Sequence, residues 1–94
     1  MGKKIRESVD KFAELMENRL RENDHKGGWS NENTDWLFKR LLDESDELKK
    51  AMDEYDVYQM AYTPRPGELQ DRRRNVRKEC ADVANFAMMI ADLF

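Results

Sequence analysis

Two pairs of acidic residues, each pair three positions apart, are the side chains in this sequence best suited to metal chemistry. The first pair is Glu44 and Glu47, and the second is Glu79 and Asp82. At about 100° per residue, these acids fall within or beside the apolar faces of helical segments. Like charges three residues apart on a helix repel each other, and a carboxylate buried alone is very costly. A positive charge is therefore expected between the two pairs.

A hard divalent cation meets this requirement, because Mg²⁺ prefers oxygen ligands. The sequence predicts a magnesium site formed by Glu44, Glu47, Glu79 and Asp82, with Mn²⁺ as a substitute ion. Alternatively, the acids are ordinary residues at the helix rims that form salt bridges with lysine or arginine. Two inward-facing pairs on separate helices favour the metal. Zinc and di-iron sites are disfavoured, because the sequence holds one Cys and one His, which lies outside the helices.

A loop with paired glycines supplies the first candidate ligand contacts, and it reads His25-Lys26-Gly27-Gly28-Trp29. Lys26 could contact a phosphate, although the loop is not a Walker A motif. His25 and Trp29 could contact a nucleobase, since bases stack on aromatic rings. The alternatives are a solvated lysine, a surface histidine and a tryptophan that packs on the helices, as we expect for Trp36.

Polar residues around the second acidic pair are further candidates. Asn85 lies one turn beyond Asp82 and could hold a sugar or a metal-bound water, or lie at a subunit interface. A cluster of basic residues precedes Glu79 and includes Arg74 and Lys78. Some of its members could hold phosphates, because arginine suits bidentate phosphate contacts. A solvated basic face is the alternative.

Three amphipathic helices are expected to position these residues, at about 4–23, 34–62 and 68–94. Thr34 is the predicted N-cap of the second helix. Glycines interrupt the chain after the first helix, and residues 63–67 (Thr-Pro-Arg-Pro-Gly) do so after the second. The prediction is one all-α domain over residues 1–94, with antiparallel helices in a bundle that oligomerisation completes. The apolar face of the first helix comprises Ile5, Val9, Phe12, Met16 and Leu20, and that of the second comprises Leu37, Leu41, Leu48, Ala51 and Tyr55. The apolar face of the third helix comprises Val76, Cys80, Val83, Ala87, Ile90 and Phe94.

The composition excludes several other classes of protein. Charged and hydrophobic residues each make up 39% of the 94 residues, which suits amphipathic helices and not a disordered chain. The net charge of −3 disfavours nucleic acid as a partner. No signal peptide and no membrane segment are expected. A single cysteine favours a reducing cytoplasm over secretion.

Together, these motifs resemble the MazG-like nucleotide pyrophosphohydrolases of the all-α NTP pyrophosphatase superfamily. The matching acidic motifs are Glu44-Ser45-Asp46-Glu47 and Glu79-Cys80-Ala81-Asp82, and the segments 25–29 and 79–92 are also similar. The resemblance covers most of the chain from about Phe12. It implies Mg²⁺-dependent hydrolysis of a nucleoside triphosphate, such as a dNTP or a non-standard NTP, to the monophosphate and pyrophosphate. It also implies a helical oligomer. Because Phe86, Met89 and Leu93 lie on a different side of the third helix from its other apolar residues, we expect a homodimer or a dimer of dimers with this helix at the interface.

Within this hypothesis, Mg²⁺ bridges phosphates and lowers the pKa of a coordinated water. Attack at the α-phosphorus is implied by the resemblance. Glu47, at the edge of its apolar face, is the candidate catalytic base. Two alternatives from other classes stay open. One is a non-enzymatic helical oligomer that binds a partner through its third helix, and the other is a sensor that binds nucleotide without turnover.

Overall fold

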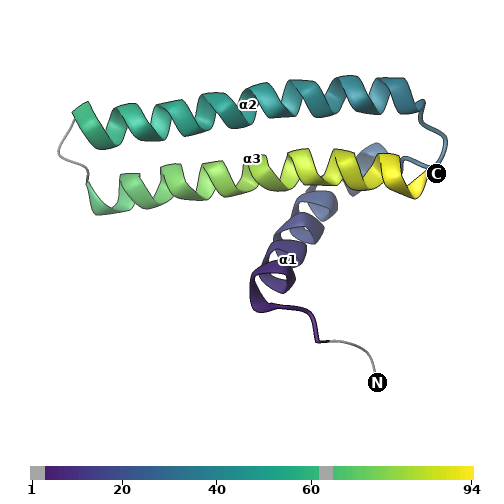
Figure 1. Cartoon of the computed structure of the whole chain (residues 1–94), viewed down its shortest axis with the longest axis horizontal. Coiled ribbons are helices and arrows are strands. Elements are labelled where there is room, and N and C mark those ends of the chain that lie inside the picture. The colour runs from purple at the N-terminus through teal and green to yellow at the C-terminus, as the bar shows by residue number, and fades with distance from the viewer. Residues whose placement is uncertain (1–3, 62–64) are drawn as a thin grey trace.

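The computed structural model describes residues 4–61 and 65–94, and every regular element among them is helical. The helices are α1 (Glu7–Glu22), α2 (Thr34–Ala61) and α3 (Pro66–Asp92), with a short 3-10 helix, η1 (Asp24–Lys26), after α1. Helices α2 and α3 form a long antiparallel hairpin, and α1 meets α3 at a steep angle (Figure 1). The predicted all-α fold class is therefore confirmed. None of the described helices combines the length and apolarity needed to cross a bilayer.

The helix ends show where local chemistry differs from the predicted boundaries. Asn33, and not Thr34, caps α2, because its Oδ1 accepts hydrogen bonds from the backbone N–H groups of Asp35 (2.8 Å) and Trp36 (3.1 Å). Helix α3 begins at Pro66, earlier than predicted, since proline fits the first turn of a helix. The predicted connector at 63–67 thus ends before Pro66, and residues 62–64 lie outside the described residues.

The buried core is small and lies along the α2–α3 hairpin. Leu37 and Ala51 of α2 and Ala81 of α3 are the buried apolar residues in the described part of the chain. The predicted apolar face of α2 is confirmed, since its other three members, Leu41, Leu48 and Tyr55, are partly buried.

The predicted apolar face of α3 is centred on the wrong residues. Its buried residues are Ala81 and Asn85, whereas Ala87 and Phe94 are exposed. The physical reason is that α3 packs against both α1 and α2. Its buried face is therefore determined by two neighbours and not by one apolar stripe.

Helix α1 is attached to α3 and not to α2 among the described residues. Its Cα atoms approach those of α3, and among the described residues none comes close to α2. The Asn85 side chain fastens the two helices, because its Nδ2 donates to the backbone oxygen of Met16 at 3.0 Å. Ile5 and Val9, at the predicted apolar face, are exposed. The N-terminal end of α1 points away from the α2–α3 hairpin (Figure 1).

Leu37 should be a main determinant of stability, because its side chain is only 1% exposed. We expect Leu37→Ala to lower the free energy of unfolding by about 2–5 kcal/mol, since it removes buried methyl groups and leaves a cavity. Urea unfolding at a fixed protein concentration measures the change. The matched control, Lys39→Ala at an exposed position of the same helix, should shift it by at most about 0.5 kcal/mol. Equal losses in the two variants would contradict this assignment of the core.

Candidate functional site

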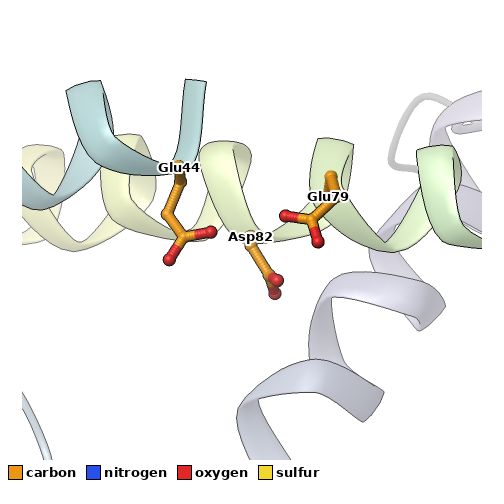
Figure 2. Close-up of side chains that lie close together, drawn as sticks. All are labelled: Glu44, Glu79 and Asp82. Carbon is orange, nitrogen blue, oxygen red and sulfur yellow. The ribbon is translucent and has the colours of Figure 1, made fainter. Parts of the chain in front are cut away.

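Three of the four predicted metal ligands lie together where α2 passes α3. One carboxylate oxygen from each of Glu44, Glu79 and Asp82 lies within 4.8 Å of the other two. Figure 2 shows Glu44 reaching across from α2 and the other two side chains projecting from α3. The Glu44 and Asp82 side chains are only 16% and 17% exposed. The α2–α3 hairpin therefore brings acidic groups that are far apart in the sequence into one partly buried space.

Glu47, the fourth predicted ligand, lies at the edge of this group. Its side chain is exposed, and it is not among the acids whose oxygens converge. Its charge still acts on the group, because it helps to raise the pKa of Glu44 and of Glu79. Glu47 is therefore near enough to interact with the cluster while remaining accessible to water.

Burial and mutual repulsion shift the titration of the inner acids. Burial is the largest cause of a raised pKa for Glu44, and the charge of Asp82 is the next. The pKa of Glu79 is raised by the same two causes in the same order. Nearby arginines oppose both shifts, Arg40 for Glu44 and Arg19 for Glu79. The cluster is therefore short of positive charge even with the arginines present.

Two arginines that the sequence analysis did not select bind the acidic cluster. Arg19 of α1 donates from Nε and Nη2 to the two oxygens of Asp82, each at 2.9 Å. Arg40 of α2 donates from Nη2 to Glu44 at 2.9 Å and stacks over the ring of Phe86. The helical spacing of Arg40 and Glu44 is a usable sequence signal. No sequence signal could have found Arg19, which is 63 positions from Asp82.

Glu79 differs from the other two inner acids. Within the described part of the chain, it has neither a hydrogen bond nor an ion pair, whereas Asp82 and Glu44 have arginine partners. Four carboxylates, including Glu47, thus face two guanidinium groups. An additional cation fits this donor set, because carboxylate oxygens are the ligands that Mg²⁺ prefers.

A pocket of about 410 Å³ opens beside the cluster, a size suited to a small molecule. It lies between the α1–α2 loop and the adjoining faces of the three helices. Glu44 and Asp82 line it together with the predicted contacts Lys26, Trp29 and Asn85. The fold therefore brings the glycine loop and one acid of each pair to one cavity. Its other lining residues include Arg19, Arg40, Trp36 and Phe86.

The loop backbone is held against the end of α3. Gly27 adopts a positive φ of 89°, which favours glycine at this position. Trp29 donates from Nε1 to the carboxylate of Asp92 at 3.0 Å. Trp36 is 48% exposed and lines the same pocket, so the prediction that it packs over the helices is wrong. Its place near the start of α2, at the pocket wall, accounts for the exposure.

Asn85 has an unsatisfied atom in this pocket. The residue is 4% exposed, and its Nδ2 is engaged with Met16. Its Oδ1 has no hydrogen-bond partner among the described residues. A buried carbonyl oxygen without a partner costs free energy, so this acceptor would be stabilised by an N–H or O–H donor that reached it.

The remaining predicted contacts lie elsewhere. His25 is an exposed residue of η1, next to Lys26, but does not line the pocket. Arg74 is exposed and pairs with Asp71 at 2.8 Å. Lys78 is partly buried, and it too is absent from the pocket lining. These three residues are therefore not among the residues that line the pocket.

Comparison with known proteins adds no constraint on these assignments. No protein-family model, curated protein or solved structure matches the chain.

The raised pKa of Glu79 predicts how the cluster affects stability in the absence of metal. An acid whose pKa is higher in the folded state stabilises the fold at low pH, and this contribution is lost as pH rises through the raised pKa. Glu79→Gln should therefore melt at a higher temperature than the wild type near neutral pH. We expect the gap to shrink as the pH falls below the usual titration range of glutamate.

Thermal melts from about pH 3 to 8 in EDTA measure this difference. Glu14→Gln, at an exposed position on α1, is the control and should show no comparable gain at neutral pH. A melting temperature of Glu79→Gln that stays below the wild type throughout this range would show that the Glu79 charge is compensated.

Proposed function

We propose that this chain is a Mg²⁺-dependent nucleoside triphosphate pyrophosphohydrolase, which releases the monophosphate and pyrophosphate. The observation that carries the proposal is the single pocket that joins Glu44 and Asp82 to the Lys26 loop and to the orphaned oxygen of Asn85. These elements could serve many phosphorylated ligands. The choice of a triphosphate, and of the α-phosphorus, rests on the resemblance to the MazG-like family.

In this proposal, Glu44, Glu79 and Asp82 hold Mg²⁺, with Glu47 beside them. Bound there, Mg²⁺ would neutralise phosphate charge and lower the pKa of a coordinated water. The exposed carboxylate of Glu47 is suited to accept the proton from the attacking water, because it lies next to the cluster without belonging to the converged group.

The other pocket residues would bind and orient the nucleotide. Lys26 would contact the phosphates from the loop. Trp29 and Trp36 both line the cavity and offer aromatic surface to a base. The Oδ1 of Asn85 would accept a hydrogen bond from the ligand, which would relieve its unsatisfied state. Arg74 and Lys78 have no role in binding the nucleotide within this chain, because neither lines the pocket.

Hydrolysis in ¹⁸O-labelled water, with Mg²⁺ and a set of ribo- and deoxynucleoside triphosphates, tests the reaction. We expect pyrophosphate release, with the label in the nucleoside monophosphate. Glu44→Ala and Asp82→Ala should abolish turnover, because each removes an inner carboxylate. The matched control Asp46→Ala, at an exposed position within the first acidic motif, should retain it.

Other products would each reject part of this proposal. Label found only in pyrophosphate would place attack at the β-phosphorus, and release of orthophosphate would indicate an ordinary phosphatase. Tight binding of Mg²⁺-nucleotide without product would instead favour the nucleotide sensor. Absence of both binding and turnover would favour the non-enzymatic interaction protein.

We further propose that the chain assembles into a homodimer or a dimer of dimers. The described chain buries only three apolar residues but exposes several large ones along α2, such as Phe38, Leu42 and Val57. Ile5 and Val9 add exposed apolar surface on and just before α1. A surface with this much exposed apolar area favours association.

Light scattering at micromolar concentration measures the assembly. We expect a mass of two or four chains. The paired substitution Phe38→Ser with Leu42→Ser should shift it toward the monomer, because both side chains are large, apolar and exposed on one helix. A wild-type protein that remains monomeric at this concentration would exclude the proposed assembly.

A further inference from the structure

The guanidinium of Arg19 occupies the position at Asp82 that a cation would need. It donates to both carboxylate oxygens at 2.9 Å, and both side chains are largely buried, at 23% and 17% exposure. Fork-to-fork pairs of this kind are among the strongest hydrogen-bonded ion pairs in proteins. Any metal ion that takes Asp82 as a ligand must therefore compete with Arg19.

Arg19 can leave Asp82 without detaching its helix. Helix α1 has a separate attachment to α3, the hydrogen bond from Asn85 to the backbone of Met16, which lies about one turn away from Arg19. Arg19 is also one of the residues that line the pocket. An anion bound in the pocket would therefore give the Arg19 guanidinium a new partner after it leaves Asp82.

Two features of the same pocket indicate that it takes a ligand. The Oδ1 of the buried Asn85 has no hydrogen-bond partner in the part of the chain that the structure describes. Arg40 lines the pocket as well, and it donates to one oxygen of Glu44 and to one oxygen of the exposed Asp43. The two arginines thus lie where phosphate oxygens would replace the carboxylates as their partners, because guanidinium groups bind phosphate in the same forked geometry.

We propose that Arg19 is a built-in counter-ion that competes with Mg²⁺ for Asp82 and transfers to the nucleotide phosphates when they enter. This inference rests on the proposed function and adds a coupling to it. Mg²⁺ alone binds weakly, because it must displace a guanidinium that would lose its forked, largely buried pairing with Asp82 and keep only the exposed Glu22 as a partner. The triphosphate supplies that partner, so each ligand strengthens the binding of the other by the same factor.

Calorimetric titration with Mg²⁺ in the absence of nucleotide tests the competition. Arg19→Gln should bind Mg²⁺ roughly tenfold more tightly than the wild type, a typical size for coupling of this kind. The matched control is Arg21→Gln, which removes an equal charge from the same helix at an exposed pair with Glu17. It should change the affinity by less than about twofold, because exposed charges are screened.

The coupling is tested by repeating the titration with an α,β-imido triphosphate analogue. The analogue should strengthen Mg²⁺ binding to the wild type by roughly tenfold, and to Arg19→Gln by much less. Arg19→Lys keeps the charge but loses the forked geometry of the guanidinium. Its Mg²⁺ affinity without nucleotide should therefore fall between those of the wild type and Arg19→Gln. This variant carries the test if Arg19→Gln does not fold, as judged by thermal unfolding in EDTA.

The outcomes separate this inference from the proposed function. Wild-type Mg²⁺ affinity in both folded Arg19 variants overturns the counter-ion, even if the enzyme releases pyrophosphate. Tighter Mg²⁺ binding by the variants supports the counter-ion, even if no triphosphate is hydrolysed, and in that case the proposed reaction alone is wrong. Equal strengthening by the analogue in the wild type and Arg19→Gln overturns the coupling.

Discussion

Repulsion among carboxylates at the α2–α3 contact is the constraint on which the rest of this structure depends. Glu44, Glu79 and Asp82 place oxygens within 4.8 Å of one another in a partly buried space. Three such charges cannot share that space unless protons, arginines or a metal compensate them. Arginines compensate part of this charge in the described structure. Arginines bind Asp82 and Glu44, and the pKa values of Glu44 and Glu79 are raised by burial and by neighbouring charge.

This constraint explains the position of α1. The helix lies against α3 and not against α2, and its second half delivers Arg19 to Asp82. Its first half continues away from the hairpin and leaves Ile5 and Val9 exposed. Helix α1 therefore contributes little to the apolar core. It contributes instead the Arg19 guanidinium, which pairs with Asp82. A small core and an acidic centre together leave the isolated chain with little apolar stabilisation.

The same geometry links the glycine loop to the cluster. Because α1 ends beside Asp82, the chain must turn there to reach the start of α2, and the positive φ of Gly27 lies within that turn. Trp29 then contacts Asp92 at the far end of α3. The turn, the first residues of α2 and the middle of α3 thus become the walls of one pocket. Binding surface and acidic cluster are two results of the same chain path.

The sequence by itself determined the helices, the inward acids and the glycine loop, because these depend on local periodicity and on residue chemistry. Glu44, Glu79 and Asp82 were predicted from their places on apolar helical faces, and the fold brings them together. The α2 face around Leu37 followed from the same pattern.

The tertiary structure alone decided which arginine neutralises which acid. Arg19 and Asp82 meet only because α1 crosses α3, and no periodicity relates positions so far apart in the chain. It likewise decided that Asn85 joins two helices while one oxygen faces no partner, and that Trp36 lines a pocket instead of a core. Such outcomes depend on how helices pack against each other, which residue spacing within one helix cannot specify.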